Sequence, residues 1–312
     1  MKRFIIKTLL LVSPVFLLVV SMEHQLQQIP NDYSYKKSYL DNNSGEIQIL
    51  ILGASGGFLG INPVYISDNA FNACHVSESL DWSFKILKKY QNKLNSLDII
   101  ILQITYPSLW YKLENDIESW RVKNYAVYYG IKSNSLKNNF EFLSNPFLMN
   151  IERLIKYYLK KNNDIACNSL GWGTGYKSEL AIDLRETAKK AAFRHTVDIF
   201  SEENIILFNE NLKVLNLFSE FCKQKNISLV FLTPPTYLSY RENIDYEQYN
   251  EMVKTINSFV KEHSNCYHLN FFDNNDFVAK DFFDADHLNE IGAEKLSLMI
   301  FEKLKEKNLI KP

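Results

Sequence analysis

The chain has 312 residues, of which 46% are hydrophobic and 14% aromatic, so it can form a substantial core and is unlike a disordered protein. Lys and Arg number 35 and Asp and Glu number 36, which gives a net charge of -1. This balance argues against a dedicated nucleic-acid-binding protein, because such a protein usually carries a surplus of basic residues.

The N-terminus has the features of a targeting segment. Lys2, Arg3 and Lys7 accompany an apolar stretch that reaches membrane-spanning length over residues 4–22, although Pro14 interrupts it. We expect residues 1–22 to be a signal peptide or, the interpretation we favour, an uncleaved signal anchor. The flanking positive charges would stay in the cytoplasm and leave the remaining chain outside it. Residues 23–46 are polar without a clear period and are predicted to form a stalk or linker.

The rest of the chain, residues 47–312, is predicted to be one α/β domain. Short apolar runs, typical of buried strands, alternate with helical patterns, and this alternation favours a parallel sheet of about five strands. The predicted strands are residues 47–52, 70–74, 98–104, 228–233 and 266–270, and the predicted helices are residues 79–94, 212–225, 246–262 and a last helix starting near Asn289.

The stretch from residue 107 to residue 203 breaks this alternation. It is rich in aromatic residues and is predicted to be a mostly helical insertion, since a crossover between two strands needs far fewer residues. Insertions of this kind often supply lids and substrate walls. His195, in this insertion, could reach the site described below, although a surface position on a helix is the simpler interpretation.

A serine follows the first predicted strand within a glycine-rich turn. Ser55 would lie at the carboxyl edge of the parallel sheet, where open α/β sheets bind their ligands. The neighbouring residues Gly53, Gly56 and Gly57 allow a tight turn whose amides could face an oxyanion.

A second motif precedes the last helix. Asp284 and His287 lie three residues apart, so one loop can offer both a carboxylate and an imidazole. A serine hydroxyl needs such a base to attack an ester, and the base needs an acidic partner that fixes its tautomer.

Together the two motifs resemble those of the SGNH (GDSL-like) hydrolase superfamily, in which the nucleophile follows the first strand and an Asp-x-x-His loop precedes the last helix. The chain is more closely similar to exported SGNH-like proteins of bacterial polysaccharide-biosynthesis loci. The resemblance extends from about residue 24 to the end and rests on four segments: Leu52-Gly-Ala-Ser55, Gly60-Ile-Asn-Pro63, Asp284-Ala-Asp-His287-Leu-Asn289 and Gly292-Ala293.

The resemblance implies a three-layer, flavodoxin-like α/β fold with Ser55 as nucleophile, His287 as base and Asp284 as the residue that orients it. It implies esterase or O-acyltransferase chemistry on a glycan outside the bacterial inner membrane, without a metal or organic cofactor, and allows for a membrane acyltransferase partner. We expect four further residues to line the oxyanion or substrate site: Gly56, Ser77, Asn72 and Asn62.

The chain departs from the family pattern at three places. Gly56 stands where the closer relatives often have a histidine, and the second family block, here residues 72–78, lacks its usual glycine. Ser77 could still donate its backbone N–H there. The third block usually supplies an asparagine side chain to the oxyanion, but the matching strand ends with Gln103-Ile-Thr-Tyr-Pro107.

Two alternatives to an enzyme of this family remain open on the sequence. A catalytically weak scaffold that binds a glycan or a membrane partner would keep the fold without the activity. An NAD(P)-binding Rossmann protein would explain the glycine-rich turn, but no acidic residue ends a second strand at the expected spacing of about 20 residues.

Overall fold

The centre of the fold is a five-stranded parallel sheet with the strand order β2-β1-β3-β4-β5. This confirms the predicted fold class and the number of strands. The strands are β1 (Ile49–Leu52), β2 (Ala70–Asn72), β3 (Ile99–Gln103), β4 (Ser228–Thr233) and β5 (Cys266–Asn270). All four pairings are parallel, so the carboxyl ends of the strands share one edge.

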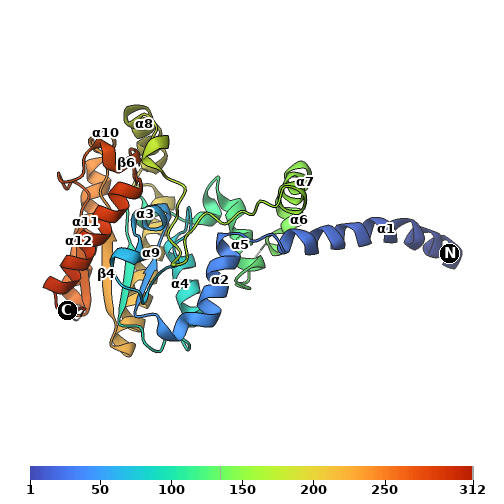
Figure 1. Cartoon of the computed structure of the whole chain (residues 1–312), viewed down its shortest axis with the longest axis horizontal. Helices are drawn as coiled ribbons and strands as arrows, with labels where there is room; N and C mark the ends of the chain where they lie inside the picture. Colours follow the sequence, from blue (N-terminus) through green and yellow to red (C-terminus); the bar gives the residue numbers. More distant parts are fainter. Residues whose placement is uncertain (134, 311–312) are drawn as a thin grey trace. The chain divides into compact units, whose positions relative to one another are not determined.

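The computed structural model describes residues 1–133 and 135–310, and the chain forms two compact units (Figure 1). The sheet unit comprises Tyr39–Asp116 and Ala166–Pro312. The helical unit comprises Met1–Ser38 and Ile117–Ile165.

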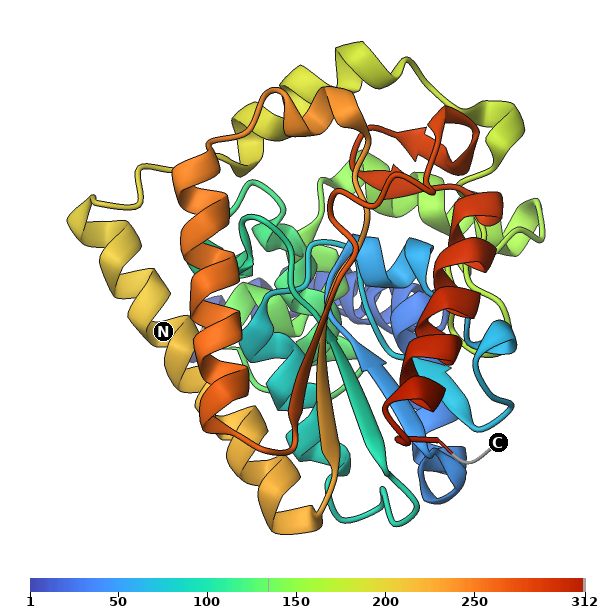
Figure 2. The same cartoon turned by 90° about the vertical axis from the view of Figure 1, so that its left-hand side faces the viewer.

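Helices cover both faces of the sheet, which gives the three layers that were expected (Figure 2). On one face, Ile49 and Ile51 share a core with residues of α3 and α12, including Phe58 and Leu296. On the other face, Phe231 meets Phe259 of α11 edge to face. The helices of the sheet unit are α3 (Ser55–Gly60), α4 (Leu80–Tyr90), α8 (Leu184–His195), α9 (Glu202–Lys225), α10 (Leu238–Arg241), α11 (Tyr246–Glu262) and α12 (Glu290–Glu306).

A short antiparallel hairpin stands where a loop was expected before the last helix. Strands β6 (Phe282–Asp284) and β7 (His287–Leu288) pair with each other, and Asn289 then caps α12 by accepting hydrogen bonds from the N–H groups of Ile291 and Gly292. The Asn289 amide also donates to the carbonyl oxygens of Lys280 and Phe282. The hairpin and the helix start are therefore tied together by one buried side chain.

The helical unit corrects the prediction of a stalk at residues 23–46. Helix α1 (Lys2–Gln27) runs through Pro14 without a break, and α2 (Asp32–Asn43) follows it; α2 crosses from the helical unit into the sheet unit. Tyr33 and Leu40 of this polar segment are buried, so its few apolar residues face the interior of the protein. The remaining helices of the helical unit are α5 (Val122–Val127), α6 (Glu141–Ser144) and α7 (Phe147–Leu154), followed by a π-helical turn (Ile155–Leu159).

The predicted insertion is divided between the two units. Residues 117–165 belong to the helical unit, whereas the flanking parts belong to the sheet unit. Helix α1 is long and apolar enough to cross a membrane, and none of its most apolar 18-residue window is buried.

Replacement of Gly292 by alanine should destabilise the sheet unit. A Cβ at this position would overlap the carbonyl oxygen of Asp281 and lie 2.7 Å from Leu288 Cδ2. Alanine forms helices better than glycine by about 1 kcal/mol, yet we expect a net loss of about 1–3 kcal/mol from overpacking. Chemical denaturation would measure this loss of unfolding free energy. Gly175→Ala is the control, since no atom lies within 4 Å of a Cβ added at Gly175. Equal midpoints for both variants would contradict this packing.

Candidate active site

Ser55 lies at the carboxyl edge of the sheet, directly after the turn that follows β1. The turn begins at Gly53, whose φ of 134° is a conformation that residues with side chains rarely adopt. Ser55 is the first residue of α3, and its Oγ is 2.8 Å from Nε2 of His287. The two residues are 232 positions apart in the chain, so only the fold brings them together.

The β6–β7 hairpin holds His287 against Asp284. The Nδ1 atom of His287 is 2.9 Å from Oδ1 and 3.1 Å from Oδ2 of Asp284, and the His287 backbone N–H donates to the same Oδ1 at 2.8 Å. A carboxylate on Nδ1 fixes the ring tautomer that leaves Nε2 free to accept the Ser55 proton. The three residues thus form an unbroken chain of hydrogen bonds.

A second carboxylate changes the electrostatics of this chain. Asp286 Oδ2 lies 3.6 Å from His287 Nδ1. Burial disfavours the charged imidazole, but the nearby carboxylates of Asp286 and Asp284 outweigh it and raise the pKa of His287 to about 9. Burial also raises the pKa of Asp286, whereas the charge of His287 lowers the pKa of Asp284 against the effect of burial.

Gln103 lies beside the glycine-rich turn that carries Ser55. In the sequence it was noted only because the strand that ends with it lacks the family's asparagine. Its side chain is 3% exposed, and neither its amide nitrogen nor its amide oxygen has a hydrogen-bond partner among the described residues. A Cβ at Gly53 would be 2.6 Å from Gln103 Cβ, and one at Gly56 would overlap Gln103 Nε2. The glycines therefore admit this side chain. Gln103 ends β3, so it lies at the same edge of the sheet as Ser55, and this position could have identified it from the sequence as a residue of the site.

The glycine-rich turn is accordingly not free for a dinucleotide. A Rossmann turn needs open space over its glycines so that a pyrophosphate can approach. Gln103 occupies the space over Gly53 and Gly56, and Cys74 occupies that over Gly57, where a Cβ would be 2.7 Å from its sulfur. Helix α3 is also only six residues long. These contacts argue against the NAD(P)-binding alternative.

Two predicted backbone donors have N–H groups without a hydrogen-bond acceptor in the part of the chain that the structure describes. They are those of Gly56, in the first turn of α3, and Ser77, in the loop after β2. Ser77 has a φ of 58°, a strained value for serine, and its carbonyl accepts from Tyr111. That loop runs along the end of β1, because the His75 N–H donates to the Gly53 carbonyl at 3.1 Å.

Two other predicted site residues support the fold, and for Asn72 this corrects its assignment to substrate binding. The Asn72 amide nitrogen donates to the carbonyl oxygens of Gly57 and Ile61, both at 2.8 Å, and its oxygen accepts from the Cys74 N–H. This fully buried side chain braces α3. Asn62 instead caps the short turn that begins at Pro63, where its Oδ1 accepts from the Val64 N–H.

His195 and Tyr176 border His287. For His195 this agrees with the interpretation that it reaches the site, whereas Tyr176 was not predicted there. His195 Nδ1 lies 2.8 Å from the Tyr240 hydroxyl, and burial, helped by the charge of Arg194, lowers the pKa of His195 to about 3. This imidazole is therefore neutral and held in place. The Tyr176 ring meets His287 edge to face with ring centroids 5.6 Å apart, and it stacks on Phe283.

The donor atoms of Asp284, Asp286 and His287 lie within 4.8 Å of one another, close enough to surround a metal ion. Both ring nitrogens of His287 already have partners, Ser55 on one side and Asp284 on the other. The arrangement therefore suits proton transfer better than metal binding.

No protein-family model and no curated protein matches the chain. Three solved structures are distantly similar in fold. A GDSL-like lipase from Bacteroides thetaiotaomicron VPI-5482 has 9% identity and a TM-score of 0.42, over 88% of this chain and 99% of that one. A provisionally assigned acylhydrolase from Bacteroides fragilis NCTC 9343 has 7% identity and a TM-score of 0.42, over 87% and 96%.

The third structure, provisionally assigned as a platelet activating factor from Streptococcus pneumonia, has 11% identity and a TM-score of 0.41 over 96% of this chain and 99% of that one. Likenesses this distant carry no argument about the reaction of this protein. The case for its chemistry therefore rests on the site itself.

Replacement of Asp286 by asparagine should lower the pKa of His287. The substitution removes one of the two carboxylates that favour the charged ring, so the pKa should fall from about 9 toward the ordinary value of about 6.5. An NMR titration of the histidine ring protons would measure the change. Asp273→Asn removes the same charge at an exposed position and should leave the pKa of His287 unchanged. An unchanged His287 pKa in Asp286→Asn would contradict the electrostatic account.

Proposed function

We propose that this protein is a serine-dependent acyl-ester enzyme that transfers or removes O-acyl groups on an extracytoplasmic glycan. The hydrogen-bonded chain from Ser55 through His287 to Asp284 carries the proposal. It supplies a nucleophile, a base and the group that orients the base, each at hydrogen-bonding distance from the next.

In the proposed reaction, the neutral form of His287 is the reactive one, and Ser55 Oγ attacks the carbonyl carbon of the ester while its proton moves to His287 Nε2. Asp284 stabilises the resulting imidazolium. The proton then passes to the departing alcohol, and the acyl group remains on Ser55 as an ester. Water or a glycan hydroxyl, deprotonated by His287, completes hydrolysis or transfer and regenerates the serine.

The developing oxyanion needs donors that are already in place before the reaction. We assign this role to the free N–H groups of Gly56 and Ser77 and to the Gln103 amide, which lies unpartnered beside Gly56. Gln103 would stand in for the asparagine of the resembled family. A buried amide without a partner costs free energy in the resting protein, and a bound ester could provide the missing contact.

The glycan substrate and the place of action have two separate grounds. The glycan follows from the resemblance to proteins of polysaccharide-biosynthesis loci. The extracytoplasmic side follows from Lys2, Arg3 and Lys7, which precede or begin the apolar part of α1. If the acyl donor is delivered through the membrane, a membrane acyltransferase would be the partner that supplies it.

Replacement of Ser55 or His287 by alanine should abolish the activity. Without the nucleophile or its base, we expect turnover of p-nitrophenyl acetate to fall by at least about 10³-fold, since members of such a triad act as a unit. A fluorophosphonate probe should label the wild type and not Ser55→Ala. Ser264→Ala, which changes an exposed serine, should behave as wild type. A wild type that neither labels nor turns over, yet binds glycan, would favour the scaffold alternative.

Replacement of Gln103 by methionine should lower kcat and leave KM nearly unchanged. Methionine fills a similar volume without an amide, so the loss of one oxyanion donor should cost about 10²–10³-fold in kcat. Steady-state kinetics would show the effect, and equal unfolding midpoints would show that the core is intact. A kcat equal to that of the wild type would remove Gln103 from the oxyanion site.

A further inference from the structure

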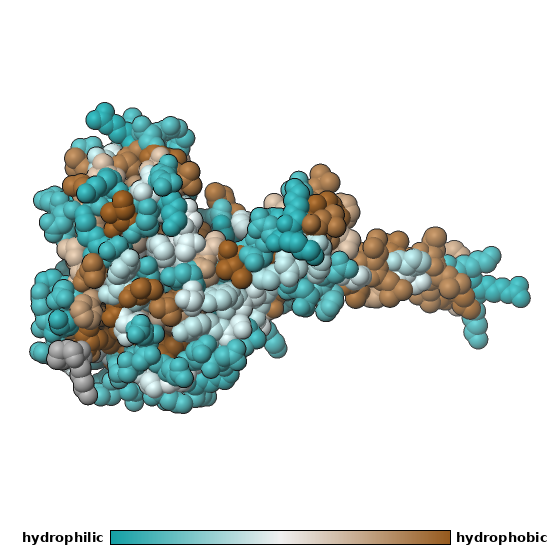
Figure 3. Space-filling view, in the orientation of Figure 1, coloured by the Kyte–Doolittle hydropathy of each residue, from teal (hydrophilic) through white to brown (hydrophobic). Residues whose placement is uncertain are grey.

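The helical unit carries a group of exposed apolar side chains, which we call its apolar face. Leu148 and Leu159 are 73% and 75% exposed, and the other members are at least 41% exposed. The full set is Leu143, Phe147, Leu148, Met149, Ile155 and Leu159. Apolar surface covers both α1 and the segment around α7 (Figure 3). Exposed apolar side chains gathered on one segment in this way often mark a surface that contacts a membrane or another molecule.

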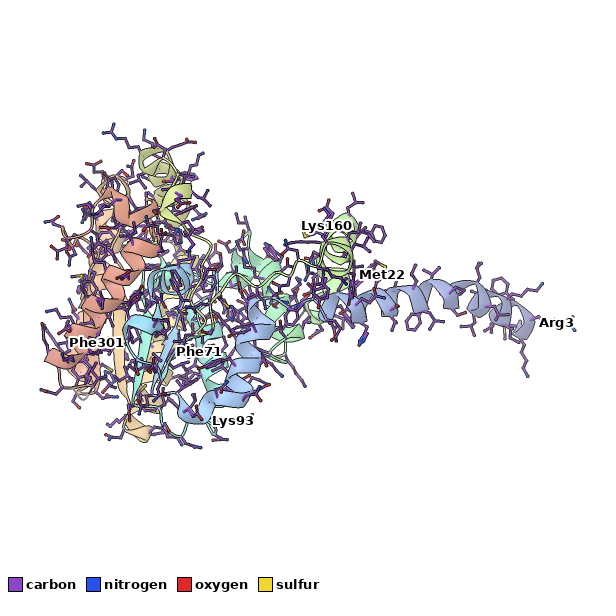
Figure 4. All side chains as sticks on the ribbon, in the orientation of Figure 1. Arg3, Met22, Phe71, Lys93, Lys160 and Phe301 are labelled. Carbon is purple, nitrogen blue, oxygen red and sulfur yellow. The ribbon has the colours of Figure 1, made fainter. Side chains whose placement is uncertain are left out.

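The segment that carries the apolar face is fixed to the end of α1 within the helical unit. Glu23 of α1 accepts hydrogen bonds from the backbone N–H groups of Glu141 and Phe142, at 3.0 and 2.7 Å. The Tyr158 hydroxyl donates to the carbonyl oxygen of Gln25 at 3.2 Å. Met22 and Lys160 accordingly lie near each other, with Arg3 at the far end of α1 (Figure 4).

A buried ion cluster makes this connection stiff. Glu141 is fully buried and binds Lys123, Arg153 and the Tyr128 hydroxyl, the last two at 2.6 Å. Loss of one partner would leave an uncompensated buried charge, so the cluster holds α6 and α7 in one arrangement.

If α1 crosses a bilayer, the lengths along this helix bring the apolar face to the membrane surface. The exposed apolar residues of α1 run from Phe4 to Val20, about 25 Å of helix, against about 30 Å of hydrocarbon in a bilayer. Met22 is the first buried residue. Glu23 and Gln25 then lie about 5–8 Å beyond Val20 along the helix, which equals the depth of the headgroup layer.

Charges near the apolar face suit lipid headgroups. Lys160 and Lys161 are exposed, and neither forms an ion pair with another described residue. Glu152 is the exposed acidic residue of α7, and Lys156 is paired with Asp164. Exposed apolar residues beside free lysines are typical of segments that lie in the interface of a membrane with anionic lipids.

We propose that the apolar face inserts into the lipid interface next to α1 and forms a second membrane contact of this protein. This inference rests on the membrane anchoring by α1 that the sequence predicts and that an extracytoplasmic site of action would use. A helix that crosses a bilayer alone is free to tilt and rotate, and its flanking contacts decide both. The apolar face would therefore fix the rotation of the helical unit at the membrane surface.

Lipid quenching would test the contact in the full chain, with Cys167, the partly exposed cysteine, replaced by serine. An environment-sensitive fluorophore is attached to cysteine at Leu148 or, in a separate variant, at Leu10 within α1. The protein is reconstituted into vesicles of phosphatidylcholine and phosphatidylglycerol with no other protein. Nitroxide groups on the lipid headgroup or at two depths along the acyl chain report the position of each label.

The label at Leu148 should be quenched most strongly by the shallow nitroxides, about 5–10 Å into the interface, and that at Leu10 by the deep ones. Ile155→Asp with Leu159→Asp should remove the quenching at Leu148. The charge-matched Asn162→Asp with Asn163→Asp should not.

The two labels separate the failure of this inference from the failure of the anchor. Quenching at Leu10 without quenching at Leu148 would leave the anchor in place and overturn the inference, and the apolar face would then be assigned to a protein partner. Absence of quenching at both positions would refute the membrane anchoring itself.

Discussion

The hydrogen bond between Ser55 and His287 depends on the alignment of β1 and α3 with the β6–β7 hairpin and α12. It joins the first and last parts of the domain, so it forms only if β1 ends at the same edge as the β6–β7 hairpin. Packing of α12 against α3 provides this alignment, and the buried Asn72 and Asn289 side chains fix the two segments that carry the reacting groups. Asn72, which the sequence suggested for substrate binding, thus helps to position the site from within the core.

Close packing of side chains explains why the turn after β1 is rich in glycine. Gln103 and Cys74 approach the backbone so closely that side chains at Gly53, Gly56 and Gly57 would collide with them. A glycine-rich turn is compatible with either a bound phosphate or a close side chain, and the sequence pattern is the same in both cases. The occupied space over the glycines separates the two functions, and it leaves a buried amide next to the serine.

The two histidines of the site differ in which charge state their surroundings favour. Asp286 adds a second carboxylate near His287 and favours its charged form, whereas His195, directly after Arg194, is kept neutral by burial. The two imidazoles therefore have opposite roles. One can exchange a proton with Ser55, and the other is a structural neighbour that holds Tyr240.

The sequence alone determined the α/β class, the five strands, the last helix and the three residues Ser55, Asp284 and His287, because these leave local signals: short apolar runs, helical periodicity and two compact motifs. It did not determine the helical state of residues 32–43, whose polar composition hides the few buried side chains, nor the roles of Gln103, Tyr176 and Asn72. Those roles depend on contacts between segments far apart in the chain. Only the tertiary structure decides which polar side chain is saturated inside the fold and which is left with an open hydrogen-bonding group at the site.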